Sequence, residues 1–281
     1  MKTGLAIWHY PHRSFVENAD FFANSSLESI SILGFHMIEI CKCEADAQRL
    51  AEIAASTGVV LTVHHKLPRS HNEEDVAFFK GSIDLFGAWQ KKYGLISILS
   101  FDVSDSIRDR VASYLDYVLE QVPACKVAVE DFGLTEMERA QIEYLKDEPR
   151  FGYLLDMGHL NIRMHGKDEK GYALFTTSAS EGGVIEHPKT ADFLYAFRSK
   201  EFPVFEIHLH NNDGKLDLHE FLEVGDIDMR ELAQAIYDFG FDGIVTIETV
   251  PGDRYEGRRE ESDRDIWRTI HYWEELYAAC K

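Results

Sequence analysis

The sequence predicts a single domain of the α/β class, a (β/α)₈ TIM barrel that spans residues 1–281. Short apolar runs of strand length alternate with longer amphipathic segments of helical period. The chain holds eight such runs, and eight strand–helix units within about 250 residues are typical of this barrel. An open doubly wound sheet is less favoured, because no glycine fingerprint follows the first run.

Residues with a β-branched or aromatic side chain are frequent in all eight predicted strands, and their lengths suit buried strands. The predicted strands are residues 4–8, 36–40, 59–65, 95–101, 126–132, 151–157, 204–210 and 243–249. In a barrel, the C-terminal ends of these strands meet at one mouth, where active sites of this fold lie.

Amphipathic segments fill the intervals between the strands. The expected helices are residues 27–33, 47–54, 76–89, 107–122, 193–197, 229–239 and 266–277. Four of them are followed by a glycine in the position of a C-cap: Gly34, Gly58, Gly94 and Gly240. Asp228 is the expected N-cap of the helix that starts at Met229.

Residues 163–186 form the longest stretch with a weak pattern. Such a stretch after a strand is often a lid or a binding loop, and a surface insertion without a role is the alternative. The sequence leaves its role open.

The composition limits the classes of partner. A formal charge of −20 opposes nucleic acid as a partner, because such binding depends on Lys and Arg contacts to phosphates. No run approaches the roughly 18 apolar residues of a membrane span, and the N-terminal apolar stretch is too short for a signal peptide. The four cysteines lack the spacing of a zinc site. We therefore expect free thiols and a cytoplasmic protein, with a homo-oligomer left open.

Ionisable residues stand at the ends of most predicted strands, on the face of the residue two positions before. Carboxylates that converge there repel one another, and burial disfavours their charged forms. A divalent cation bound by these carboxylates and the imidazoles would balance the negative charge. Such a mixed set suits manganese, zinc, iron or cobalt better than calcium or magnesium. We keep manganese, zinc, cobalt and magnesium as candidate cofactors. The residues are Glu39, His64, Glu130, Asp156, His210 and Glu248.

Two local motifs add candidates. His159 follows Asp156 by three residues, in the first turn beyond the strand. Asp217 and His219 lie two residues apart in the loop after His210, so both side chains can point the same way in an extended loop.

The order VAVED, LLDMGH, HNND, DLH, GDID and TIET, from Glu130 to Glu248, resembles the xylose isomerase-like TIM barrels. That superfamily includes endonuclease IV-type enzymes and sugar or sugar-phosphate isomerases and epimerases. The resemblance implies a central metal quartet and further ligands or substrate contacts. The quartet is Glu130, Asp156, His210 and Glu248, and the further residues are His159, Asp217, His219 and His64.

The sequence departs from both subsets of this superfamily. The endonuclease-type site has a histidine at the end of the fourth strand, where this chain has Ser100 and Phe101. The ketose 3-epimerases have an arginine shortly after the metal histidine, where this chain has Lys215 and Leu216.

The resemblance favours a metal-dependent isomerase or epimerase that acts on a small sugar-like substrate through an enediolate. Glu130 and Glu248 are the expected acid and base, and His159 is expected to hold a substrate oxygen. Alternatives are a phosphodiesterase at abasic sites in DNA, a dehydratase of a hydroxy acid, and a barrel that only binds ligands. Residues expected to bind the substrate are His64, Glu39, Lys215 and Arg254.

Overall fold

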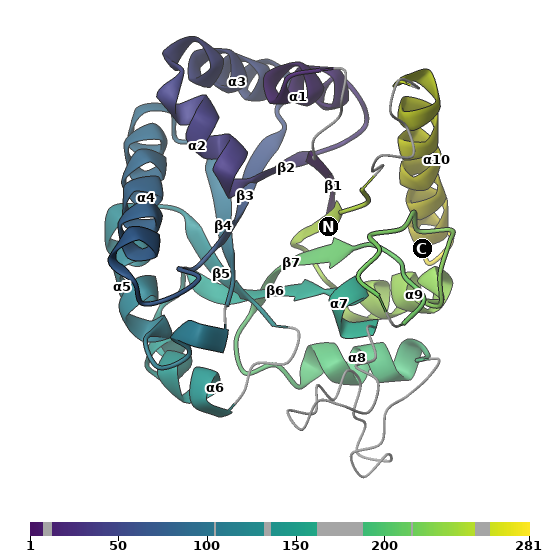
Figure 1. The fold of residues 1–281 in the computed structure, drawn as a ribbon. Helices are drawn as coiled ribbons and strands as arrows, with labels where there is room; N and C mark the ends of the chain where they lie inside the picture. The colour runs from purple at the N-terminus through teal and green to yellow at the C-terminus, as the bar shows by residue number, and fades with distance from the viewer. Residues whose placement is uncertain (8–12, 104, 132–135, 162–187, 215, 251–258) are drawn as a thin grey trace.

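A computed structural model describes residues 1–7, 13–103, 105–131, 136–161, 188–214, 216–250 and 259–281. Its eight strands are all parallel and form a closed barrel in the order of the sequence, from β1 to β8 (Figure 1). The predicted (β/α)₈ barrel is therefore confirmed.

The barrel closes where the first strand pairs with the last, with Gly4 beside Thr246 and Leu5 beside Ile247. Every strand thus has two parallel neighbours, and the described sheet has no free edge. The strands are β1 Lys2–Ile7, β2 Ser29–Leu33, β3 Val60–Lys66, β4 Ile96–Asp102, β5 Lys126–Glu130, β6 Phe151–Asp156, β7 Val204–Leu209 and β8 Ile244–Ile247.

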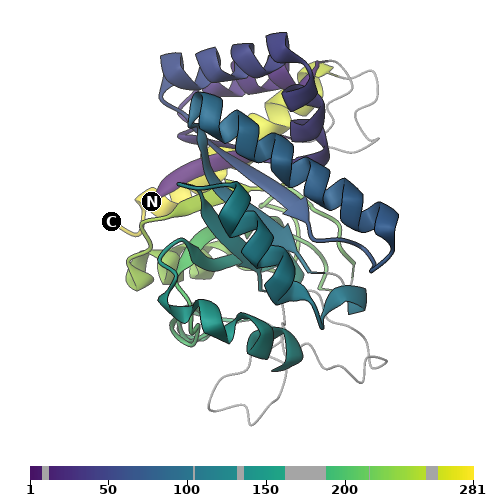
Figure 2. The ribbon, with the colours of Figure 1, turned by 90° about the vertical axis from the view of Figure 1, so that its left-hand side faces the viewer.

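Helices surround the strands on the outside (Figures 1 and 2). They pack on the outward apolar side chains of the strands, such as Leu5, Ile30 and Val127, which are fully buried. The helices are α1 Phe15–Ala23, α2 Gly34–Lys42, α3 Glu44–Thr57, α4 Glu73–Tyr93, α5 Val111–Gln121, α6 Glu136–Ile142, α7 Met157–Asn161, α8 Thr190–Arg198, α9 Met229–Phe239 and α10 Arg259–Ala278. Among the described residues, every helix is too short or too polar to cross a membrane.

The caps of several helices follow from their sequence. Gly58, Gly94 and Gly240 end α3, α4 and α9 in the left-handed region, with φ of 77°, 67° and 70°. Asp228 accepts hydrogen bonds from the backbone N–H groups of Arg230 and Glu231 and so caps α9. These predictions are confirmed.

The second strand and the following helix differ from the prediction. Residues 36–40 belong to α2, and the strand is Ser29–Leu33, which the pattern placed in a helix. The alternation of serine and isoleucine in this strand has period two: Ser29 and Ser31 share the inner face with Thr62 of β3, while Ile30 and Ile32 face outward.

Gly34 therefore begins α2 instead of ending a helix, and its backbone lies against His65 of β3. A Cβ at Gly34 would lie 2.2 Å from His65 Nδ1. This close approach explains why the position holds a glycine.

The interior of the barrel has an apolar cluster of its own. It consists of Ile98, Ala128, Leu154, Phe205 and Ile244. Ala128 and Leu154 each lie two residues before a carboxylate that ends its strand. The cluster therefore supports the polar mouth from its N-terminal side.

Candidate active site

Five of the six predicted strand-end residues lie at the C-terminal mouth of the barrel. Glu130 and Asp156 are the last residues of β5 and β6, and His210 and Glu248 follow β7 and β8 directly. His64 lies two residues before the end of β3. Glu130, Asp156, His210 and Glu248 are all buried, so the mouth concentrates ionisable groups away from bulk water.

Asp156 lies at the centre of this set. Its Oδ1 accepts a hydrogen bond of 2.7 Å from the backbone N–H of His159 and lies 3.1 Å from His210 Nε2. Its Oδ2 lies 3.7 Å from His159 Nδ1 and 4.0 Å from His208 Nδ1. Burial raises the pKa of Asp156, but the surrounding imidazoles outweigh burial and hold that pKa well below its usual range.

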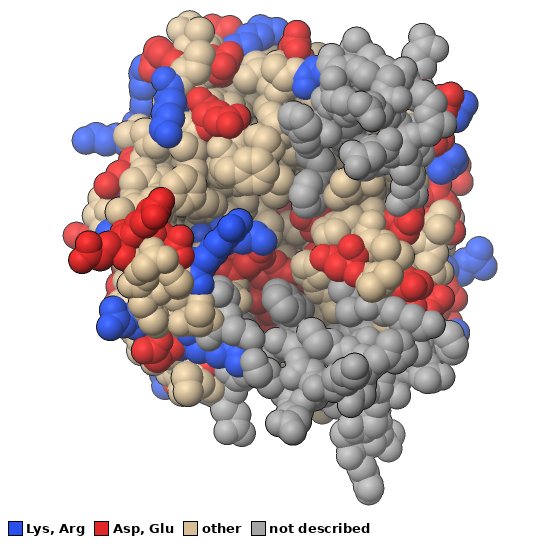
Figure 3. Space-filling model, in the orientation of Figure 1, with Lys and Arg blue, Asp and Glu red and all other residues tan. Residues whose placement is uncertain are grey.

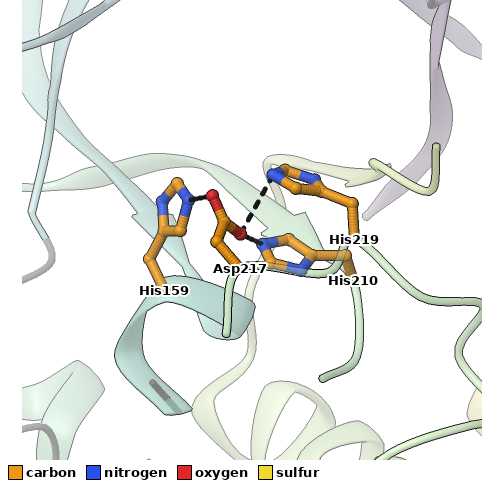
Figure 4. A group of neighbouring side chains, drawn as sticks. All are labelled: His159, His210, Asp217 and His219. Atoms are coloured by element: carbon orange, nitrogen blue, oxygen red, sulfur yellow. Dashed lines mark hydrogen bonds and ion pairs between the residues drawn. The ribbon is translucent and has the colours of Figure 1, made fainter. Parts of the chain in front are cut away.

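A group of four residues, His159, His210, Asp217 and His219, offers ligand atoms that all lie within 4.8 Å of one another (Figure 4). Asp217 Oδ2 lies 3.1 Å from His159 Nε2, and its Oδ1 lies 3.2 Å from His219 Nε2. The rings of His210 and His219 stack with centroids 3.8 Å apart. The helix α7, the end of β7 and the loop after it thus contribute to one group.

A hydrogen bond to the backbone orients the ring of His219. Its Nδ1 lies 2.9 Å from the backbone oxygen of Glu248 and donates to it, so Nε2 is the ring nitrogen that faces Asp217. His219 has φ of 44°, a strained backbone for a residue with a side chain. Such strain is often found at functional sites.

A second group joins the ends of β3, β4 and β5. His64 Nε2 lies 2.9 Å from Asp102 Oδ1 and 3.4 Å from Glu130 Oε2, and its Nδ1 lies 3.0 Å from Ser100 Oγ. Burial lowers the pKa of His64, but the two carboxylates outweigh it and raise the pKa well above its usual value. Glu130 Oε1 lies 2.6 Å from His159 Nδ1 and so links this group to Asp156 and α7.

Burial and the nearby charge of Asp102 raise the pKa of Glu130. A raised pKa at a buried carboxyl group in a cleft is a property of many general bases.

A third group extends from Glu248 into the barrel. Glu248 Oε2 lies 2.9 Å from His208 Nδ1, and His208 Nε2 lies 3.4 Å from Glu206 Oε1. Thr246 and Thr62 both donate to Glu206 Oε1, at 2.6 and 3.1 Å. Burial lowers the pKa of His208, but the two carboxylates raise it to about 10.

Three residues of these groups, Asp102, Glu206 and His208, are not among the predicted site residues. Asp102 lies two residues after Ser100 on the inward face of β4, so the alternation rule contained the signal. Glu206 and His208 lie two residues apart on the inner face of β7, but the period-two pattern alone does not show that Glu248 contacts His208.

Glu39 is the one strand-end residue that the structure does not bring to the site. Its strand prediction was wrong: Glu39 lies in α2, with 76% of its side chain exposed. Lys215, Arg254 and residues 163–186 lie outside the described residues. His65 packs near Phe79 and Phe86, where burial lowers its pKa to about 4.

The donor atoms of the site fit a divalent cation. Glu130 Oε2, Asp156 Oδ2 and both ring nitrogens of His210 are buried without a hydrogen bond, although His210 Nε2 lies near Asp156. Buried polar atoms are normally satisfied. Oxygen and imidazole nitrogen atoms that converge in this way are the ligands that manganese, zinc and related ions prefer.

A cavity of about 610 Å³ opens over these groups, and its described lining includes His64, His159, Asp217, His219 and Glu248. Figure 3 shows Asp and Glu side chains within the hollow at the centre of this face, with Lys or Arg side chains beside them. The site is therefore accessible to a small molecule.

Comparisons with known proteins agree with this architecture. A family model described as xylose isomerase-like TIM barrel matches residues 28–269. Curated proteins gave no match.

Solved structures of similar fold include an L-ribulose 3-epimerase, with a TM-score of 0.67, 13% identity, and coverage of 99% of this chain and 95% of the other. A D-psicose 3-epimerase with D-tagatose from Clostridium cellulolyticum H10 has a TM-score of 0.63, 12% identity and 99% coverage of both chains. The probable 3-DHS dehydratase AsbF from Bacillus anthracis has a TM-score of 0.62, 15% identity, and coverage of 94% of this chain and 98% of the other. At these identities, the likeness shows the fold.

Proposed function

Because the chain belongs to the xylose isomerase-like TIM barrel family, we propose that it is a divalent-metal-dependent isomerase or epimerase of a sugar or another α-hydroxy-carbonyl compound. The observation that carries the proposal is the convergence of buried carboxylates and imidazoles from β5, β6, β7 and β8 around Asp156. The epimerases among the structures of similar fold support the choice of reaction.

We assign the central cation to Glu130, Asp156, His210 and Glu248. The unsatisfied buried atoms of Glu130, Asp156 and His210 support this assignment, and Glu248 lies in one group with Asp156 and His208. When bound, the cation would act as a Lewis acid toward a substrate carbonyl.

His159, Asp217 and His219 are the proposed further ligands, because they form a group of four with His210. The same residues would hold a second cation if two are bound.

Glu130 and Glu248 are the proposed acid and base. Glu130 ends β5 and Glu248 follows β8, three strands apart in the barrel, so they can approach a substrate from two sides. One would remove the proton from the carbon next to the carbonyl, and the other would return a proton. His159, which lines the cavity with 23% of its side chain exposed, would donate to a substrate oxygen.

A second candidate is a phosphodiesterase at abasic sites, which the group of His159, His210, Asp217 and His219 favours. The charge of −20 opposes it, and so does the end of β4, where Asp102 stands and no histidine is present. A dehydratase of a hydroxy acid would use the same central quartet.

The test begins with the metal content of the purified protein, followed by deuterium uptake from solvent into a panel of ketoses. Uptake that Glu130→Gln abolishes supports the proposal. Glu39→Gln is the matched control, because it removes a carboxylate that is exposed on α2, and it should retain uptake.

Nicking of abasic DNA, or loss of water from a hydroxy acid without deuterium uptake by ketoses, would replace the proposal with one of its rivals. Full turnover by Glu130→Gln would refute the assigned acid–base role.

A further inference from the structure

The cavity continues beyond the groups that the proposed reaction uses. From His64 and Asp102 it extends over the β2–α2 junction, the end of β3 and the N-terminal half of α4. The described lining of this part is mainly apolar, and we call it the aromatic arm: Leu33, Phe35, Leu67, Pro68, Phe78 and Phe79.

Two phenylalanines of the aromatic arm are exposed. Phe35 in the first turn of α2 is 49% exposed, and Phe78 in α4 is 57% exposed. Phe79, the neighbour of Phe78, is instead buried against Phe101 and Tyr114, so the core does not need the ring of Phe78. Exposed rings that line a cavity gain stability when a ligand covers them.

The cavity is also large. Its volume of about 610 Å³ falls within the ~300–1,000 Å³ of pockets that enclose drug-sized ligands. The acids and imidazoles occupy only one end of it, so a ligand held at that end has room to extend along the aromatic arm.

The arm also contains charged residues, because Lys66, Arg69 and Asp75 line it. Lys66 Nζ lies 3.1 Å from Asp102 Oδ2, so a neighbouring carboxylate balances this cation. Asp75 accepts hydrogen bonds from Ser70 and Asn72 within its own turn. Phe35 and Phe78 are the exposed apolar surface of the arm that a ligand can cover.

We propose that the substrate carries an apolar, planar group that binds against Phe35 and Phe78, while its α-hydroxy-carbonyl end lies at the carboxylates and imidazoles. The second half of this inference rests on the proposed function. The observation behind the first half is that one continuous cavity contains both the exposed rings and the polar groups.

The test uses two small ligands with the same head, hydroxyacetone and 2-hydroxyacetophenone, which differ by a methyl and a phenyl group. Calorimetric titration of the full chain loaded with Mn²⁺ should show about tenfold tighter binding of 2-hydroxyacetophenone, since a phenyl ring buries a large apolar area. Phe78→Ala and Phe35→Ala should each reduce this preference about fivefold and leave hydroxyacetone binding unchanged. Phe21→Ala is the control, because Phe21 is an exposed phenylalanine of α1 that does not appear among the described lining residues.

Equal affinity for the two compounds, absent binding of 2-hydroxyacetophenone, or a preference that survives both substitutions would overturn the inference. A fall in molar mass of the Phe78→Ala protein by light scattering would also overturn it, because a second copy would then cover the rings. Titration of the metal-free protein, first with Mn²⁺ and separately with the two ligands, distinguishes the two proposals. No uptake of Mn²⁺ refutes the proposed function, while the phenyl preference still decides the role of the aromatic arm.

Discussion

Replacement of Gly158 by alanine tests whether the position of His210 controls metal binding. Gly158 is the second residue of α7, and its backbone oxygen accepts a 2.7 Å hydrogen bond from Asn212 Nδ2. A Cβ at this position would lie 2.0, 2.2 and 2.3 Å from Cε1, Nε2 and Nδ1 of His210. The glycine therefore allows the imidazole to lie directly against the backbone of α7.

The size of the effect follows from these distances. Ordinary contact begins near 3.4 Å, so the ring of His210 must retreat by 1.4 Å from its Cε1 contact. His210 is fully buried and stacks on His219 at 3.8 Å, which leaves little room for retreat. Mutations that disturb a metal ligand or its hydrogen-bonding partners typically lower metal affinity ~10–100-fold. Overpacking of a buried position lowers the free energy of unfolding by about 1–3 kcal/mol.

Calorimetric titration with Mn²⁺ or Zn²⁺ gives the affinity, and urea unfolding followed by circular dichroism gives the stability. Gly81→Ala is the matched control, because no atom lies within 4 Å of the added Cβ in the middle of α4. It should raise the free energy of unfolding by about 0.5–1 kcal/mol and leave metal affinity unchanged. A folded Gly158→Ala protein that binds the metal as tightly as the parent would refute the assignment of His210.

Three further outcomes are expected. Thr246→Val removes the 2.6 Å hydrogen bond to the buried carboxylate of Glu206. It should therefore lower the free energy of unfolding, measured in urea, by about 1.5–3 kcal/mol. An unchanged midpoint of urea unfolding would mean that Glu206 does not depend on this donor. Iodoacetamide at pH 8 should alkylate the exposed Cys43 first. Burial raises the pKa of Cys41 and of Cys125 to about 12, so the reactive thiolates of these two residues form only near that pH. Mass spectrometry checks this order, and early labelling of Cys125 would contradict the buried position. Mn²⁺ at one hundred times its dissociation constant should stabilise the protein by about 2.7 kcal/mol over the EDTA-treated protein, and identical unfolding curves would argue against a site in the native state.

Seven of the eight strands could be predicted from the sequence, because each contains a continuous apolar run or an apolar pattern of period two. It failed at Ser29–Leu33, where the strand is short and alternates serine with isoleucine. The following run, with buried Met37, Ile38 and Ile40, is continuous enough to resemble a strand but lies in α2. Short apolar runs of this kind do not separate helix from strand by pattern alone.

The placement of Glu130, Asp156 and Glu248 at the mouth of the barrel could be predicted, because strand ends alone decide it. The predicted site was incomplete where contacts cross the barrel. The pairing of His64 with Asp102 depends on the register of β3 against β4, which shifts between Leu61 and Thr62 in a way that the sequence does not reveal. The prediction for Glu39 was wrong, because residues 36–40 belong to α2 and not to a strand.

The junction between β1 and β8 has a practical consequence for anyone who trims the chain. The family match begins at residue 28, so a version cut to the matched range would lack Lys2–Ile7. Without that segment, β2 and β8 would each present an unpaired edge, the kind of surface that recruits other chains into aggregates. Glu248, which follows β8, would then lose the support of a neighbour that lies more than two hundred residues away in the chain.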